Sequence, residues 1–158
     1  MKLSFQEEYG LRCLFQVAAL SEPGYLTINE ISEYEGLSVS YVAKLMRVLR
    51  QHGFVRSVRG QVGGYALARP ADQIIVGEVL AALGGRLFDP HFCIEHSGLE
   101  VACKKLTDCS IRTLWRTLQT LVDQVLSKVT LADLVDNSEW EMTSHVSTLV
   151  QLEPKNRN

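Results

Sequence analysis

The chain of 158 residues has few of the features that mark membrane, secreted or catalytic proteins. No segment approaches the roughly 18 consecutive apolar residues of a membrane span. Acidic residues stand in the opening MKLSFQEEYG, where a signal peptide needs an apolar core. Neither a nucleophile–base pair nor a phosphate-binding loop is apparent. We therefore expect a cytoplasmic protein without a membrane partner, and we do not expect an enzyme.

The formal net charge of −2 hides an uneven distribution. Residues 1–69 contain eight Lys or Arg and six Asp or Glu, whereas residues 70–158 contain eight and twelve. Because salt screens charges beyond about 8–10 Å, local clusters matter more than the net value. A local cluster of basic residues favours a nucleic-acid partner, although a helix face that is simply exposed to water can have the same composition. Residues 44–69 contain no acid and six basic residues, which are Lys44, Arg47, Arg50, Arg56, Arg59 and Arg69.

The pattern of apolar residues predicts a mainly α fold with one small β-hairpin. Capping boxes at Ser4 to Glu7 and at Thr27 to Glu30 mark the starts of two helices. Asp108 or Ser110 can cap a long helix nearer the C-terminus, and three glycines suit a hairpin turn. The predicted helices cover about residues 5–20, 28–34, 39–52, 75–83 and 111–129, with a short one from 130, and the strands lie in 54–58 and 65–67. The residues expected to face inward are Leu11, Leu14, Phe15 and Ala18 on the first helix and Val42, Leu45, Met46 and Leu49 on the third.

Two short helices joined by a turn at Gly36 and followed by a glycine-tipped hairpin predict a winged helix-turn-helix. Hydroxyl groups at the start of the second helix can bond to base edges or phosphates. Basic residues at three-residue spacing can follow the phosphate backbone, and Arg59 at the tip can enter a narrow minor groove. We therefore expect a double-stranded DNA operator as the partner. The expected DNA-binding residues are Ser38, Ser40, Tyr41, Lys44, Arg47, Arg50, Arg59 and Gly60.

Residues 86–107 show neither helical nor strand periodicity, which is uncommon for so long a segment unless it is functional or held in place. Cys93, Cys103 and Cys109 form the pattern C-x9-C-x5-C in or beside it. Three thiolates at this spacing can hold an iron–sulfur cluster or a zinc ion, and free thiols or a labile disulfide are the alternative. Cys13 lies in the middle of a predicted helix and is expected to be a small buried apolar residue. A Cys3His zinc site can be completed by His91 or His96.

The long predicted helix from Ile111 to Val129 has a heptad-like stripe of apolar residues. A stripe of this kind is too apolar to remain in water, so it predicts a dimer interface. The stripe consists of Ile111, Leu114, Trp115, Leu118, Leu121, Val122, Val125 and Val129.

Over about residues 1–137 the chain resembles the Rrf2 family of winged-helix regulators. The resemblance rests on MKLS…YGLR, on ISEYEGLSVSYVAKLMRVLRQHGFVRSVRGQVGGYALAR, on VGEVLAAL, on the three cysteines and on CSIRTLWRTL…VTLADLV. The segment FCIEHSGLEVAC…DCSIR is most similar to regulators associated with iron–sulfur cluster assembly genes. The resemblance implies a homodimeric regulator, most simply a repressor, with the long helix as its dimer interface. It also implies a [2Fe-2S] or [4Fe-4S] cluster held by Cys93, Cys103 and Cys109.

The chain departs from better-known members at three places. Its first cysteine spacing is nine residues rather than five, and Arg112 stands where some members have a histidine ligand. Other members use a carboxylate near the start of the first helix, and Glu8 matches that position. We expect Glu8 to be the fourth ligand; a surface pair with Arg12 is its competing role, and the two flanking histidines are the alternative ligands. Ala43 replaces an acidic base-reading residue of some members, so their operator is not transferred to this chain.

Two other function classes fit parts of the sequence. One is an iron–sulfur redox or electron-transfer protein, which would have no use for a basic helix and hairpin. The other is a structural-zinc interaction module, which would be colourless. The expected division of the chain is a winged helix-turn-helix domain in 1–84, a cysteine loop in 85–110, a dimerisation helix with a short C-terminal helix in 111–137, and a tail in 138–158.

Overall fold

The computed structural model describes residues 4–20, 24–60, 63–85 and 109–136, and these form a mainly helical fold with one two-stranded hairpin. The predicted fold class is therefore confirmed. In chain order the elements are α1 (Phe5–Ala18), α2 (Ile28–Glu35), α3 (Val39–Gln51), β1 (Val55–Val58), β2 (Gly64–Leu67), a 3₁₀ turn (Ala71–Gln73), α4 (Val76–Gly84), α6 (Ser110–Leu126) and α7 (Leu131–Val135).

Local hydrogen bonds set the ends of the helices in the DNA-binding half. Ser4 and Thr27 each form the predicted capping box, in which a hydroxyl and a carboxylate satisfy free backbone N–H groups. Helix α2 ends at Gly36, whose φ of 64° is the left-handed conformation that favours glycine. Ser38 then caps α3 two residues later, so α2 and α3 are joined by the tight turn of a helix-turn-helix.

The core lies where α1 packs against α3 and α4. All four residues predicted to face inward from α3, namely Val42, Leu45, Met46 and Leu49, are completely buried. On α1 the completely buried residues are Cys13 and Leu14, with Val17 nearly so. The face predicted from Leu11 and Phe15 therefore lies at the edge of the contact. The core fixes the direction of α3 and leaves its polar side in solvent.

The hairpin packs against the segment that precedes α2. Strands β1 and β2 are antiparallel, with Val55 opposite Leu67 and Val58 opposite Gly64, and Leu26 forms a bridge to Tyr65. Gly64 has no room for a side chain, because a Cβ there would lie 2.7 Å from the Leu26 carbonyl oxygen. The first residues of β2 thus anchor the hairpin on the segment before α2.

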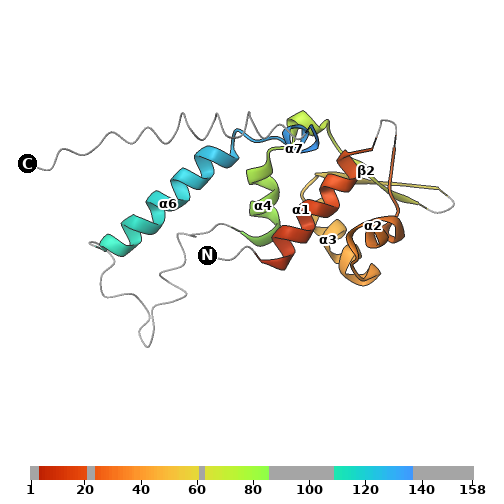
Figure 1. Cartoon of the computed structure of the whole chain (residues 1–158), viewed down its shortest axis with the longest axis horizontal. Coiled ribbons are helices and arrows are strands. Elements are labelled where there is room, and N and C mark those ends of the chain that lie inside the picture. Colours follow the sequence, from red (N-terminus) through yellow and green to blue (C-terminus); the bar gives the residue numbers. More distant parts are fainter. Residues whose placement is uncertain (1–3, 21–23, 61–62, 86–108, 137–158) are drawn as a thin grey trace, which may run out of the picture.

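The long helix α6 ends earlier than the apolar pattern predicts. It stops at Leu126, and Val129 is buried in an extended segment whose carbonyl oxygen accepts a hydrogen bond from the Val76 N–H at 2.9 Å. A bridge between Ile75 and Thr130 lies beside this bond. The long-range pairing replaces the last helical turn and places α7 in the core. Figure 1 shows α6 (cyan) on the far side of α4 from α1 and α3.

Within the part of the chain that the structure describes, no helix combines the length and apolarity that a membrane crossing requires.

Candidate nucleic-acid interface and cysteine site

The N-terminal end of α3 presents hydroxyl groups to solvent. Ser38 and Ser40 are exposed, and their Oγ atoms lie 3.3 Å apart. The Ser38 Oγ also accepts the Tyr41 backbone N–H at 3.3 Å, so this hydroxyl both caps the helix and stands at its outer end. Val39 between them is 49% exposed, although its apolar side chain gave no indication of this in the sequence. Its position directly after the helix cap is the sequence feature from which its exposure at the end of α3 could be inferred. Hydroxyl and methyl groups together can contact both the polar edges and the thymine methyl groups of DNA bases.

Tyr41 takes part in the packing of α3 on α1. Its ring is half-buried and meets the Tyr9 ring edge-on, with centroids 6.5 Å apart. Phe5 also stacks on Tyr9, with ring centroids 6.1 Å apart. The three rings form a continuous contact from the start of α1 to the start of α3.

Four of the predicted basic residues lie in solvent along α3 and just beyond β1. Lys44, Arg47 and Arg50 are exposed on α3, and Arg59 is exposed after the end of β1. Arg50 donates from Nη1 to the Ser57 Oγ at 3.4 Å, which connects α3 to β1. The predicted Gly60 is also exposed, with nothing nearer than 4.0 Å to a Cβ built there.

The remaining two basic residues do not join this cluster. Arg69 forms an ion pair with Glu78 at 2.9 Å, and its guanidinium lies over the Phe54 ring. Arg56 lines a cavity beneath the C-terminal end of α1. Since neighbouring residues of a strand point to opposite faces, Arg56 points away from the Ser57–Arg50 contact. The basic surface that could face DNA is therefore smaller than the composition indicated.

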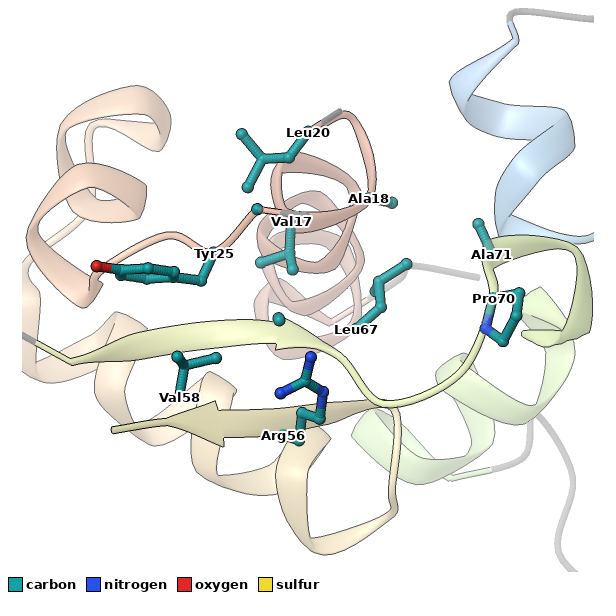
Figure 2. Close-up of a pocket in the computed structure, with 11 residues that line it drawn as sticks. Val17, Ala18, Leu20, Tyr25, Arg56, Val58, Leu67, Pro70 and Ala71 are labelled. Carbon is teal, nitrogen blue, oxygen red and sulfur yellow. The ribbon is translucent and has the colours of Figure 1, made fainter. Parts of the chain in front are cut away.

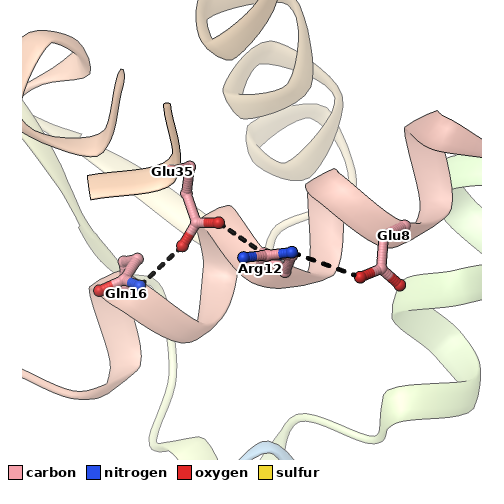
Figure 3. A network of polar contacts seen from close by, with 4 residues as sticks. All are labelled: Glu8, Arg12, Gln16 and Glu35. Atoms are coloured by element: carbon pink, nitrogen blue, oxygen red, sulfur yellow. Dashed lines mark hydrogen bonds and ion pairs between the residues drawn. The ribbon is translucent and has the colours of Figure 1, made fainter. Parts of the chain in front are cut away.

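A polar network joins α1 to the end of α2 (Figure 3). Arg12 donates from Nε to Glu35 at 2.7 Å, and Gln16 donates to the other Glu35 oxygen at 2.7 Å. Only 3% of the Glu35 side chain is exposed, and its carboxylate raises the pKa of Arg12. Glu8 lies 3.7 Å from Arg12 with half of its side chain exposed. The predicted surface pair of Glu8 with Arg12 is present, but Arg12 has its closer contact with Glu35.

Two of the cysteines lie among the described residues. Cys13 is completely buried, as predicted, and burial raises the pKa of its thiol to about 12. Cys109 is half-buried and is itself the N-cap of α6, where its Sγ accepts the Arg112 N–H at 3.5 Å. The prediction of Asp108 or Ser110 as the cap was wrong, because a sulfur acceptor between them takes that position. The other candidate ligands lie outside the described residues; they are Cys93, Cys103, His91 and His96. Among the residues that are described, no cluster of three or more potential metal ligands occurs.

The apolar stripe of α6 faces outward over much of its length. Ile111, Leu114, Trp115 and Leu121 are 64, 54, 42 and 39% exposed. Leu118 and Val125 on the same stripe are half-buried. The face is larger and more continuous than the scattered apolar residues of an ordinary surface.

Comparisons with known proteins agree with this architecture. Residues 3–137 match the model of the Rrf2 family, described as an iron-dependent transcriptional regulator. The chain is 38% identical over 139 residues to the HTH-type transcriptional regulator IscR of Sodalis glossinidius, covering 88% of this chain and 81% of that protein. It is similar to the solved structure of T. potens IscR, with a TM-score of 0.68 and 31% identity, covering 89% of this chain and 90% of that one. The structure of CymR, the global cysteine regulator of B. subtilis, gives a TM-score of 0.68 at 29% identity and covers 88% of this chain and 99% of that one. These relatives are transcriptional regulators rather than enzymes, and the chain belongs to the Rrf2 family of helix-turn-helix transcriptional regulators.

Proposed function

We propose that the chain is a homodimeric DNA-binding repressor whose operator binding is controlled by an iron–sulfur cluster. The observation that carries the DNA-binding part is the solvent face of α3, which combines hydroxyl groups at its N-terminal end with a row of exposed basic residues. Helix-turn-helix proteins insert this end of the second helix into the major groove. A dimer bound over a promoter can act as a repressor by occupancy alone.

The residues of this surface divide by chemistry. Ser38, Ser40 and Tyr41 stand at the end of α3 that would meet base edges, while Lys44 and the two arginines of α3 would contact phosphates. The Arg50–Ser57 bond keeps the hairpin beside α3, so Arg59 and Gly60 can approach the adjacent minor groove. Phosphate contacts give affinity that falls with salt, and base contacts give sequence preference.

The test of DNA binding measures fluorescence anisotropy with an operator selected from random duplexes. Arg59→Ala should weaken specific binding by about 1–3 kcal/mol, and Lys44→Ala should weaken binding to all sequences and reduce the salt slope by about one. Lys128→Ala is the matched control, because it removes an exposed charge beyond the end of α6. Equal affinities for all four proteins would contradict the proposed interface.

The proposed cluster ligands are Cys93, Cys103, Cys109 and Glu8. Cys109 suits a thiolate ligand, since its half-exposed sulfur lies at the N-terminus of a 17-residue helix and accepts a backbone N–H. Cys13 is not suited to bind a metal, because it is completely buried in the core. When bound, an iron–sulfur cluster supplies a thiolate-ligated iron centre that responds to oxidants, nitric oxide and iron supply.

Glu8 has the freedom that a ligand needs. Its side chain is half-exposed, and its 3.7 Å contact with Arg12 is the longer of the two that Arg12 makes. Glu8 can therefore leave Arg12 without leaving that guanidinium unpaired, because the bond to Glu35 remains. Helix α1 packs on α3, so a bond at Glu8 would act on the helix that positions the recognition residues. A carboxylate is also a weaker match for iron than the three thiolates beside it.

The cluster is tested by anaerobic purification followed by a visible spectrum and by iron and sulfide analysis. Cys109→Ser is the sharpest variant, because serine keeps the helix cap and removes the thiolate. It should abolish the cluster, Glu8→Ala should shorten its lifetime, and Cys13→Ala should leave it unchanged. A colourless zinc protein would contradict the iron–sulfur cluster, and a coloured protein that does not bind DNA would contradict the regulator. A cluster lifetime in Glu8→Ala equal to that of the wild type would contradict Glu8 as a ligand.

The exposed apolar stripe of α6 supports the dimer. Because Leu114 and Leu121 lie one heptad apart on the same side of the helix, a second copy of α6 can cover both. The residues of α6 that follow Cys109 would then place the cysteine site close to the subunit interface.

A further inference from the structure

A cavity of about 720 Å³ lies between the C-terminal end of α1, the segment before α2 and the hairpin (Figure 2). Cavities that bind small molecules in proteins commonly measure about 300–1,000 Å³. Apart from Arg56 the lining side chains are apolar or aromatic, although polar atoms make up about half of the accessible lining. The residues that matter here are Val17, Leu20, Tyr25, Val58 and Leu67. Tyr25 also packs against Gly64, which holds this wall on the hairpin.

Among the residues that the structure describes, Arg56 is the one charged residue that lines the cavity. Figure 2 shows its guanidinium on the same side of β1 as Val17 and Leu67. Arg12 forms ion pairs with Glu8 and Glu35, and Arg69 forms one with Glu78; none of these three pairs involves Arg56. Arg69, which lies 13 residues further along the chain, shows the usual arrangement for an arginine beside apolar groups, with a carboxylate partner and an aromatic ring. Arg56 is exposed to solvent at the cavity, with apolar side chains beside it and without such a carboxylate.

We propose that this cavity binds a small organic monocarboxylate with an apolar chain or ring. A guanidinium offers two parallel N–H donors that match the two oxygens of a carboxylate. The apolar part of the ligand would lie against Val17, Leu20 and Leu67, where removing its methylene groups from water favours binding. The charge of Arg56 selects an anion, and the walls select an apolar one.

The cavity is separate from the proposed DNA surface. Arg56 and Ser57 point to opposite faces of β1, and Ser57 is the residue that bonds to Arg50 on α3. A ligand in the cavity can therefore be held while α3 faces DNA. The site does not depend on the cysteines or on the proposed function, so the two can fail independently.

The test is isothermal titration calorimetry of the full chain with octanoate, octanol and acetate. Octanoate should bind saturably, whereas octanol lacks the charge and acetate lacks the chain, so both should bind at least about tenfold more weakly. Arg56→Gln should reduce octanoate affinity by at least tenfold without changing the thermal unfolding midpoint. Arg116→Gln is the matched control, since Arg116 is an exposed arginine on α6, and it should bind octanoate like the wild type.

A second variant tests the walls. Leu20→Asp places an acid at the cavity and should also abolish octanoate binding. The proposal is overturned if octanoate does not bind saturably, if octanol binds equally well, or if Arg56→Gln and Leu20→Asp bind octanoate like the wild type. It is also overturned if Arg56→Gln changes the sedimentation coefficient, because the cavity would then belong to an interface between copies of the chain.

Discussion

Aspartates at Leu114 and Leu121 are expected to separate the proposed dimer without unfolding the subunit. The two leucines are 54 and 39% exposed. Complete burial of a leucine is worth about 1.5–3 kcal/mol, so covering the exposed part of each contributes about 1 kcal/mol. Both residues occur twice in a symmetric dimer, which makes about 4 kcal/mol in total. The double variant should therefore raise the dimer Kd by about a thousandfold, and more because its carboxylates would lose water.

Sedimentation equilibrium over a range of concentrations measures this change. The matched control is Thr113→Asp with Thr120→Asp, which adds the same charges at the same spacing on the polar side of α6. The control should remain dimeric, and both double variants should keep the unfolding transition of a folded subunit. The reasoning is refuted if the wild-type protein is monomeric at micromolar concentration. It is also refuted if the variant with aspartates at the two leucines dimerises like the control.

Three further predictions follow from single residues. Burial raises the pKa of Cys13 to about 12, so its thiol is protonated at pH 8. Iodoacetamide should therefore modify Cys109 in the native apo-protein, whereas Cys13 should react only after unfolding. Mass spectrometry of the modified protein measures both reactions. Gly64→Ala should destabilise the protein by about 1–3 kcal/mol in urea unfolding, whereas Gly60→Ala on the open part of the same hairpin should have almost no effect on stability. Thr27→Ala removes the capping box of α2 and should cost about 1 kcal/mol in the same assay, and an unchanged midpoint would mean that the cap contributes nothing.

The elements that the sequence predicted well are those whose signals are local. The capping boxes at Ser4 and Thr27, the turn at Gly36 and the apolar positions of α3 all depend on residues within a few positions of one another. Each was confirmed. A hydroxyl three residues before a glutamate, or a glycine at a helix end, has the same meaning in almost any tertiary context.

The features that were missed depend on distant contacts. The apolar pattern continues through Val129, and only the pairing with Val76, far along the chain, shows why α6 ends at Leu126. Glu35 looks like a surface residue in the sequence, yet it is buried because Arg12 and Gln16 of another helix bond to it.

The candidate site was predictable to a similar degree. The spacing of Lys44, Arg47 and Arg50 indicated an exposed row on α3, and the structure has one. Charge alone could not distinguish these residues from Arg69, whose partner lies nine residues away on α4, or from Arg56, which faces a cavity. The assignment of cluster ligands stays a prediction.

The most direct test of the account compares operator affinity with and without the iron–sulfur cluster in three anaerobically purified proteins. Wild type and Cys13→Ala should each change affinity by about 5- to 150-fold when the cluster is removed. Cys109→Ser should bind with the affinity of the cluster-free wild type before and after the same treatment. Equal affinities of the two wild-type forms, or a change that is lost in Cys13→Ala and kept in Cys109→Ser, would contradict the claim that these cysteines control DNA binding.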